Sequence, residues 1–262
     1  MVDTSETIME EGMVRLFQGD CLTLMDKIPD ESIDMVLCDM PFGTTHCSWD
    51  EILDLNLLWK QYKRIIKPNG AILLFAQTPF DKILGVSNIE DLRYEWIWEK
   101  TRPTGHFNAN IAPMKAHENI LVFYKSPPVY HPQFTTGHKK NCKWTKKVDT
   151  QNNTSIYNEA SVEYSGGGTT TRYPRSVLTF SPERGLHPSQ KPVELCEYFI
   201  RTYTNEGETV LDNCMGSGTC GIACLNTKRK FIGIELEEAF FNIAKDRIKK
   251  HLQEGVQETL AI

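Results

Sequence analysis

Residues 211–221 read Leu211-Asp-Asn-Cys-Met-Gly-Ser-Gly-Thr-Cys-Gly221. They join a short apolar run, residues 209–211, to a helix-like segment, Thr219–Asn226. Gly216 and Gly218 permit a tight turn and let backbone N–H groups approach a ligand closely. The stretch therefore predicts a strand, a glycine turn and a helix, the repeating unit of α/β folds.

Two acidic residues narrow the choice of ligand for this turn. Asp212 ends the strand, where its carboxylate could meet a cationic ammonium group but would repel a pyrophosphate. Glu235 ends the next strand-like run, and a carboxylate at that place accepts both hydroxyls of a ribose. We interpret the turn as a site for S-adenosylmethionine. Two alternatives stay open: NAD, because residues 216–221 also match GxGxxG, and a plain turn without a ligand.

Apolar runs of strand length alternate with helix-like segments on both sides of the turn. The expected strands are residues 14–19, 33–38, 71–76, 94–98, 119–124, 209–211 and 231–235. The expected helices are residues 20–28, 192–203, 219–226 and 237–252, with one more opened by the capping box Ser48-Trp-Asp-Glu51 and stopped by Pro68-Asn-Gly70. This order predicts an α/β fold with a doubly wound, mostly parallel sheet whose ligand lies at the carboxyl ends of the strands.

The tetrapeptide Asp39-Met-Pro-Phe42 directly follows the expected strand at residues 33–38. An exocyclic amino group of a base is a poor nucleophile, and two acceptors on its N–H bonds would draw the nitrogen toward tetrahedral geometry. The Asp39 carboxylate and the Met40 main-chain carbonyl are such acceptors, while Pro41 stiffens the turn. A base stacked on Phe42 would gain ~1–3 kcal/mol, comparable to the cost of flipping it. Taken alone, the tetrapeptide fits a strand end with a core phenylalanine at least as well.

Together with the glycine turn and His187-Pro-Ser-Gln-Lys-Pro192, this tetrapeptide resembles the motifs of the β-group of S-adenosylmethionine-dependent DNA amino-methyltransferases. The tetrapeptide is similar to their DPPY-type catalytic motif. The glycine turn is similar to their cofactor-binding motif, and residues 187–192 are similar to their HPTQKP block. Gly19-Asp-Cys21 also resembles a segment of phage-like members. The resemblance covers residues 14–125 and 185–252. It implies a Rossmann-like methyltransferase domain with a seven-stranded sheet.

By this resemblance, Asp39, Met40, Pro41 and Phe42 hold the target amino group. Cofactor binding falls to Asp20, Cys21, His187, Ser189, Lys191, Asp212, Gly216, Gly218, Thr219 and Glu235. Lys191 is expected to pair with the cofactor's carboxylate. Met40 replaces the usual proline and Phe42 the usual tyrosine, but the carbonyl and the stacking face remain.

The resemblance further implies a site-specific DNA methyltransferase of the restriction–modification kind, acting on a base flipped out of double-stranded DNA. Aspartate at position 39 favours adenine N6, and cytosine N4 is the alternative. Cytosine C5 methylation needs a nucleophilic cysteine, usually after proline, and no proline here precedes a cysteine. An NAD-dependent oxidoreductase and a non-catalytic nucleic-acid-binding module are the remaining alternatives.

Three parts of the chain differ in composition. We expect a catalytic half at residues 1–100, the last strands with a variable basic target-recognition segment at 101–184, and the cofactor-binding half at 185–262. Residues 100–184 hold 12 Lys and Arg against five Asp and Glu, although the whole chain has a net charge of −5. The candidate DNA contacts there are Arg102, Lys139, Lys140, Lys143, Trp144, Lys146, Lys147, Arg172 and Arg175.

Bulk composition points to a globular protein of 262 residues without a metal. The acidic start lacks a secretory signal and no apolar run reaches the ~18 residues of a membrane span, so the expected location is the cytoplasm. Eight cysteines form no CxxC pair, which predicts free, mostly buried thiols. Dimerisation is common in the family that the chain resembles, so a homodimer is among the expected partners.

Overall fold

The computed structural model describes residues 6–9, 12–43, 52–140, 144–147, 163–166, 168–183, 185 and 190–260. The chain divides into two compact units. The core unit comprises Met1–His131 and Ser176–Ile262, and the inserted unit comprises Pro132–Arg175.

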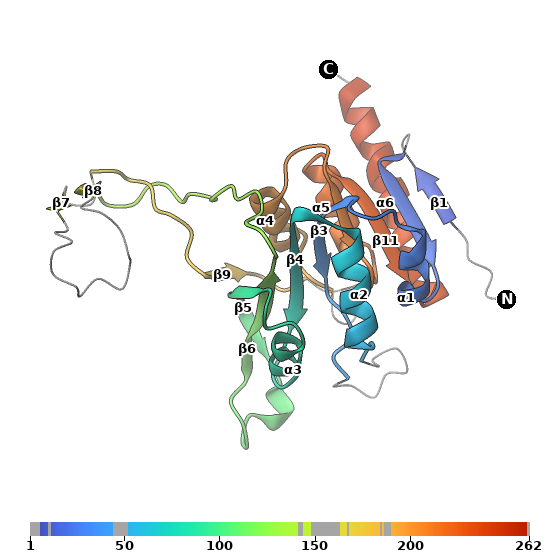
Figure 1. Cartoon of the computed structure of the whole chain (residues 1–262), viewed down its shortest axis with the longest axis horizontal. Helices are drawn as coiled ribbons and strands as arrows, with labels where there is room; N and C mark the ends of the chain where they lie inside the picture. The colour runs from blue at the N-terminus through green and yellow to red at the C-terminus, as the bar shows by residue number, and fades with distance from the viewer. Residues whose placement is uncertain are drawn as a thin grey trace. The chain divides into compact units, whose positions relative to one another are not determined.

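A nine-stranded sheet forms the centre of the core unit (Figure 1). Its strands are β1 (Glu6–Met9), β2 (Val14–Gln18), β3 (Ile33–Cys38), β4 (Ile66–Ala76), β5 (Leu92–Thr104), β6 (Lys115–Phe123), β9 (Val177–Phe180), β10 (Thr209–Asp212) and β11 (Lys230–Glu235). Their order is β1-β2-β11-β10-β3-β4-β6-β5-β9. Neighbouring strands from β2 to β4 run parallel, whereas β6 runs antiparallel to β4 and β5. The seven central strands are those expected, and β1 and β9 add one at each edge.

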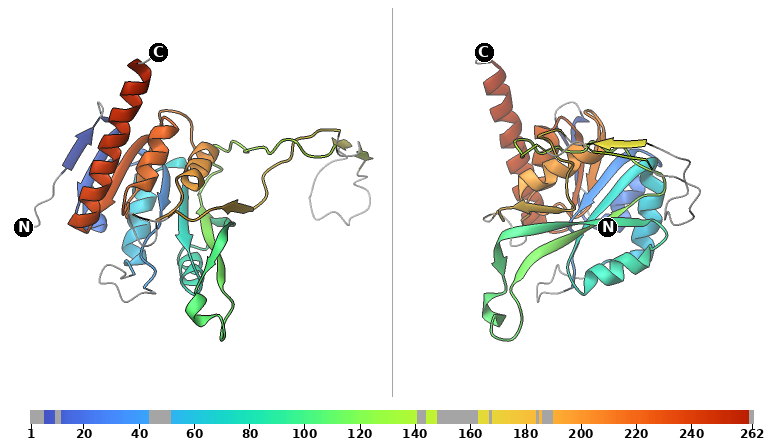
Figure 2. Two further views of the ribbon diagram at one scale, coloured as in Figure 1. Left: turned by 180° about the vertical axis from the view of Figure 1, so that it is seen from behind. Right: turned by 90° about the vertical axis from the view of Figure 1, so that its left-hand side faces the viewer.

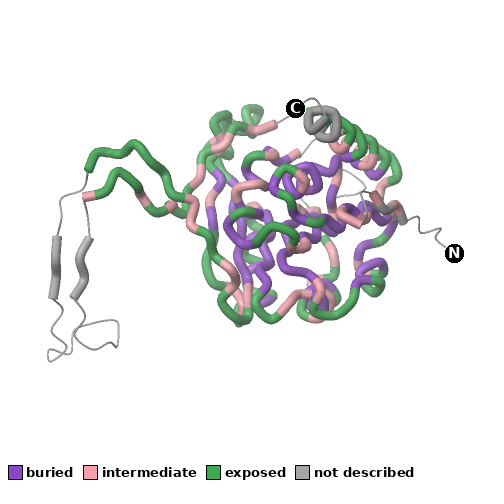
Figure 3. The backbone as a smooth tube through the Cα atoms, turned by 90° about the horizontal axis from the view of Figure 1, so that it is seen from above, coloured by how far each residue is buried: buried purple, intermediate pink, exposed green. Residues whose placement is uncertain are grey.

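Helices cover both faces of this sheet, as the views in Figures 1 and 2 agree. One face carries α1 (Cys21–Leu24), the 3-10 turn η2 (Met25–Lys27), α2 (Leu55–Ile65) and α3 (Phe80–Ser87). The other carries α4 (Val193–Tyr203), α5 (Thr219–Asn226) and α6 (Glu238–Leu260). Each face packs its own apolar core, and buried backbone runs through the middle of the core unit (Figure 3). All six residues of β3 are buried, as expected for a strand covered on both sides. The doubly wound α/β expectation is thus confirmed.

The start of α2 differs from the expectation. Ser48–Glu51 lies outside the described residues, and residues 52–54 precede the helix. The helix begins at Leu55 because the Asp54 carboxylate caps it, accepting from the N–H groups of Asn56 (2.8 Å) and Leu57 (3.1 Å). The expected start at residue 48 is therefore wrong.

The stop signal Pro68-Asn-Gly70 also has a different role. The helix already ends at Ile65, and these residues lie inside β4, where the register with β3 shifts between Ile33 and Met35. A Cβ on Gly70 would lie 2.9 Å from the Asp34 carbonyl oxygen, so glycine is required by close backbone approach at an irregularity.

A long hairpin leaves the sheet between β5 and β6. The expected pair, residues 94–98 and 119–124, is extended by β5 to Thr104 and by β6 back to Lys115. The 3-10 turn η3 (His106–Asn108) closes it after Gly105, which has a left-handed φ of +88°. Residues 101–113 and 115–117 are all exposed. We call residues 101–117 the hairpin arm.

The inserted unit contains the antiparallel pair β7 (Trp144–Lys147) and β8 (Glu163–Gly166). Its two ends are joined by paired backbone hydrogen bonds between Thr135 and Arg172, of 3.0 and 2.9 Å. Phe134 and Tyr173 pack ring against ring beside this bridge, with centroids 4.7 Å apart. The Arg172 guanidinium donates to the carbonyl oxygens of Thr169, Thr171 and Lys139, so it is held by the unit's own backbone.

The six described cysteines are free, and all but Cys214 are buried. Within the described ranges, no cluster of His, Cys, Asp and Glu side chains is suited to hold a metal ion. No helix among those residues is long and apolar enough to cross a membrane.

Candidate active site

Acidic side chains from four strands meet at one edge of the sheet. β2 is followed by Asp20 and β3 by Asp39, whereas β10 and β11 end on Asp212 and Glu235. Parallel strands bring their carboxyl ends to the same edge, and the chain crosses in opposite directions from β3 and β10, which are neighbours. Such a switch point leaves a crevice for a ligand.

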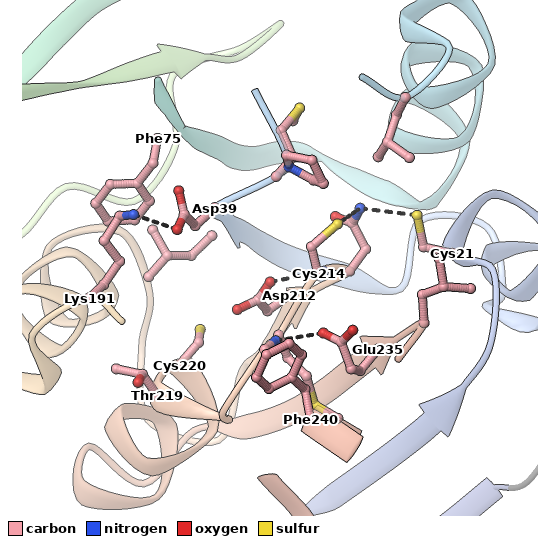
Figure 4. A pocket seen from close by; sticks show the side chains of 18 of the residues that line it. Cys21, Asp39, Phe75, Lys191, Asp212, Cys214, Thr219, Cys220, Glu235 and Phe240 are labelled. Carbon is pink, nitrogen blue, oxygen red and sulfur yellow. Dashed lines mark hydrogen bonds and ion pairs between the residues drawn. The ribbon is translucent and has the colours of Figure 1, made fainter. Parts of the chain in front are cut away.

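A cavity of about 500 Å³ occupies this edge (Figure 4). Of the residues expected in the site, Asp20, Cys21, Asp39, Met40, Pro41, Phe42, Lys191, Asp212, Gly216, Thr219 and Glu235 line it. His187 and Ser189 lie outside the described residues. The two motifs that are far apart in sequence therefore share one pocket.

Gly218 is the one described residue of the expected set that does not line the cavity. It caps α5 in a left-handed conformation (φ +77°), and a Cβ there would lie 3.0 Å from that of Ala244 on α6. Glycine is required at this position for the fold, because it lets the turn close and lets α6 pack against the turn.

Backbone contacts fix the shape of the glycine turn. The Glu235 carboxylate accepts from the N–H groups of Gly216 (2.8 Å) and Glu237 (2.9 Å), tying β11 to the turn after β10. The Cys214 N–H donates to the Asp212 carboxylate at 3.1 Å. Both carboxylates thus have defined positions in the cavity wall.

The glycine-turn end of the cavity carries negative charge that no described side chain neutralises. Burial raises the pKa of Asp212 to about 7, even though the Cys214 N–H opposes the shift. Burial also raises the pKa of Glu235, against the N–H groups of Glu237 and Gly216. No cation is paired with either carboxylate in the described part of the chain. Two desolvated anions without a counter-charge favour a cationic ligand.

This imbalance predicts that Asp212 lowers the stability of the free protein. The folded-state pKa of about 7 lies above the ordinary value near 4, so stability is lost as pH rises between them. We expect Asp212→Asn to raise the free energy of unfolding by about 1–4 kcal/mol at pH 8, with the difference vanishing toward pH 4. Urea titrations at both pH values measure it. The exposed Asp246→Asn is the matched control; a pH-independent difference would contradict the prediction.

Around Asp39 the charges are instead balanced by buried cations. The Lys191 ammonium donates to Asp39 Oδ2 and lies 3.4 Å from Glu118 Oε2. Glu118 Oε1 accepts from Lys100 (2.5 Å) and from Gln77 Nε2 (3.0 Å). Burial would lower the pKa of Lys191, but the two carboxylates outweigh it and raise the pKa. In the structure Lys191 thus pairs with Asp39 and Glu118, and its expected pairing with the cofactor carboxylate stays a prediction.

One oxygen of Asp39 remains available. Asp39 lines the cavity, and its Oδ1 is buried and has no hydrogen-bond partner among the described residues. Burial raises the pKa of Asp39 to about 6, with the ammonium of Lys191 opposing the shift. An unsatisfied buried acceptor is costly, so its presence here favours a ligand that donates a hydrogen bond.

An aromatic wall stands beside this acceptor. Phe42 lines the cavity and stacks on Phe80 of α3, with centroids 5.4 Å apart and planes 30° from parallel. Met40 is almost fully buried, which holds the turn between Asp39 and Phe42 in place. The cavity thus offers an acceptor and a ring face at one end and buried anions at the other.

Sequence reasoning missed several residues of the cavity wall. They include Ile52, Leu53, Asp54, Gln77, Glu118, Asn213 and Phe240. Glu118 stands before an apolar run, not after one. Because β6 is antiparallel, its beginning lies at the edge where the parallel strands end. An acidic residue just before the apolar run of this strand was therefore the sequence feature that could have identified Glu118.

The fold and this cavity define a class: an S-adenosylmethionine-dependent methyltransferase. Residues 33–246 match the model of the DNA methylase family N6_N4_Mtase. The chain belongs to this family, and its cofactor is S-adenosylmethionine. The buried anions at the glycine turn fit a cofactor that carries a sulfonium and an ammonium.

Individual relatives agree with this assignment. The Type II methyltransferase M2.LlaDCHI of Lactococcus lactis subsp. cremoris is 26% identical, covering 92% of this chain and 91% of its own. M.HpaI of Haemophilus parainfluenzae is 28% identical over 89% of this chain and 74% of its own. Among solved structures, the M1.HpyAVI complex with S-adenosylmethionine has a TM-score of 0.60 (24% identity; 89% and 99% covered), and the cytosine-N4-specific PvuII DNA methyltransferase has 0.62 (18%; 91% and 90%). These structures support the fold.

Proposed function

We propose that this DNA methyltransferase transfers the methyl group to adenine N6 in double-stranded DNA, at a specific sequence and after flipping the base into the cavity. One observation carries the proposal: Asp39 lines the same cavity as Phe42, and its buried Oδ1 has no hydrogen-bond partner among the described residues. An amino group on a base supplies the missing donor.

The glycine-turn end of the cavity would hold the cofactor. Glu235 is assigned the ribose hydroxyls, and Asp212, Gly216 and Thr219 the methionine end, with Asp20 and Cys21 nearer the adenine. When bound, S-adenosylmethionine supplies an electrophilic methyl group on a positively charged sulfur. No covalent enzyme intermediate is required, so positioning is the protein's main contribution, worth up to ~7–11 kcal/mol.

The catalytic turn prepares the amino nitrogen. Asp39 Oδ1 accepts a hydrogen bond from one N–H of the amino group, and the Met40 carbonyl accepts one from the other. These two hydrogen bonds localise the nitrogen lone pair. Stacking on Phe42 holds the ring and offsets part of the cost of extrusion. The nitrogen sheds one proton as it gains the methyl group, and the Asp39 carboxylate is placed to receive it.

Adenine is favoured over cytosine by the aspartate at position 39, a tendency of the family. Cytosine N4 is the second candidate, because it presents the same amino group and because a structural neighbour is cytosine-N4-specific. Both reactions use the same acceptors.

Mass spectrometry of the methylated nucleoside tests the proposal. Unmodified plasmid DNA is incubated with the enzyme and methyl-labelled S-adenosylmethionine, then digested to nucleosides. We expect label in N6-methyldeoxyadenosine. Label in N4-methyldeoxycytidine would select the second candidate, and no label in DNA would refute the function.

The sequence specificity is assigned to the inserted unit and its basic neighbours. The exposed Lys139 and Lys140 of that unit are suited to phosphate contacts. The resemblance to Type II methyltransferases further suggests the modification half of a restriction–modification system, acting as a monomer or a homodimer. Sequencing the methylated DNA would give the recognition site.

A further inference from the structure

The tip of the hairpin arm presents two apolar side chains to solvent. Phe107 is 101% exposed and Ile111 is 85% exposed, more than the other large apolar residues described. Single exposed apolar residues are ordinary, but two at the end of a projecting hairpin form a feature that packs on nothing in its own unit. A wedge of this kind is suited to a partner with apolar faces.

The charge of the arm identifies the kind of partner. Residues 101–117 contain no Asp or Glu, although the chain as a whole is acidic. The cations Arg102 and Lys115 flank the tip, His106 and His117 lie beside them, and all four are exposed. Cationic flanks around an apolar tip match a polyanion whose interior is apolar and stacked, which is duplex DNA.

The arm is anchored at the wall of the candidate active site. Glu118, the residue that follows it, lines the cavity, and Lys115 Nζ donates to Gln77 Oε1 (3.2 Å), another wall residue. A strand advances ~3.3 Å per residue, so the paired part of the arm carries the tip at least ~10 Å beyond Glu118. A base bound in the cavity would lie at about this distance from the base stack that it left.

We propose that the hairpin arm is a DNA wedge: Phe107, together with Ile111 of the same tip, enters the base stack where the target base has left it. This rests on the proposed base-flipping function. A flipped base leaves a gap between its former neighbours, and an inserted ring restores apolar contact there and slows the base's return. The wedge would therefore act on the flipping equilibrium and leave cofactor binding unchanged.

The test compares Phe107→Ala with the wild type on two duplexes that carry the enzyme's own recognition site. One is fully paired, and the other has an abasic nucleotide opposite the target base, so that extrusion costs less. We expect kcat/KM of Phe107→Ala to fall at least about tenfold on the paired duplex and less than about threefold on the abasic one. Phe107→Trp keeps a flat ring and should retain most of the rate.

Val86→Ala, at a 72% exposed position on α3, is the matched control and should behave as the wild type on both duplexes. Cofactor affinity and Tm report that Phe107→Ala is folded. Wild-type rates for Phe107→Ala on the paired duplex, or an equal loss on both duplexes, would overturn the wedge. A wild-type enzyme that methylates no DNA would instead refute the proposed function.

Discussion

Replacing Asp39 with asparagine should reduce the rate of methyl transfer by about 10²–10³-fold, the usual effect of losing one preorganised polar contact to the reacting group. The substitution keeps the shape of the side chain but removes its negative charge and exchanges one acceptor for a donor. An amide N–H directed at the amino group of a base would repel it, and the amide cannot receive a proton.

Binding of the cofactor should change little in this variant, because the cofactor is assigned to Glu235, Asp212 and the glycine turn and not to Asp39. Isothermal titration with S-adenosylmethionine and single-turnover methylation of DNA separate the two effects. Asp246→Asn makes the same chemical change at an exposed position on α6 and should retain the wild-type rate. Transfer by Asp39→Asn at the wild-type rate would show that the free oxygen of Asp39 has no part in catalysis.

Replacing Lys191 with methionine should lower the free energy of unfolding by about 3–5 kcal/mol, because it leaves the buried carboxylates of Asp39 and Glu118 facing each other without the ammonium. It should also change the pH dependence of activity. Lys191 holds the pKa of Asp39 down, so its loss raises that pKa above the present value of about 6. A larger fraction of Asp39 is then protonated at neutral pH, and a neutral carboxyl is a weaker acceptor and cannot take up the amino proton.

In the proposed mechanism the anion is the active form of Asp39, so the acidic limb of the rate profile should move to higher pH in Lys191→Met. We expect a loss of about 10–100-fold at pH 7 that recovers in part toward pH 9, whereas Asp39→Asn should not recover. The groups that act on Asp39 are Lys191, Glu118 and Lys100. Adding Glu118→Gln to Lys191→Met removes one of the two anions and should move the limb back toward lower pH. An unshifted limb in Lys191→Met would contradict this role.

Much of the fold followed from local pattern. The run at residues 33–38 and the helix at 219–226 have the predicted bounds, because a strand buried on both faces and a helix after a glycine turn leave strong signals in composition. Helix ends were less predictable. Ser48 and Asp54 are both good caps in sequence, and only the packing of Leu58, Trp59 and Tyr62 against the sheet decides between them.

Site residues that directly follow a parallel strand were predictable from the sequence. Site residues that reach the cavity through an antiparallel strand were harder to predict. Asp39, Asp212 and Glu235 follow from the rule that parallel strands end at one edge. Glu118 belongs to an antiparallel strand and lies at the same edge by its beginning, so the rule does not find it. The pairing of Lys191 with Asp39 and Glu118 was missed for the same reason, since these two acids are separated by 79 positions in sequence and meet only in the folded sheet.

The backbone bridge between Thr135 and Arg172 has an evolutionary consequence. It closes the base of the inserted unit, so residues added or deleted inside it change a loop whose ends are already pinned, and loop-closure entropy grows only slowly with length. Lineages could then exchange the interior of this unit while the sheet and its cavity are inherited intact. If the inserted unit sets the target sequence as proposed, new targets would arise by replacing this unit alone, with the chemistry left untouched.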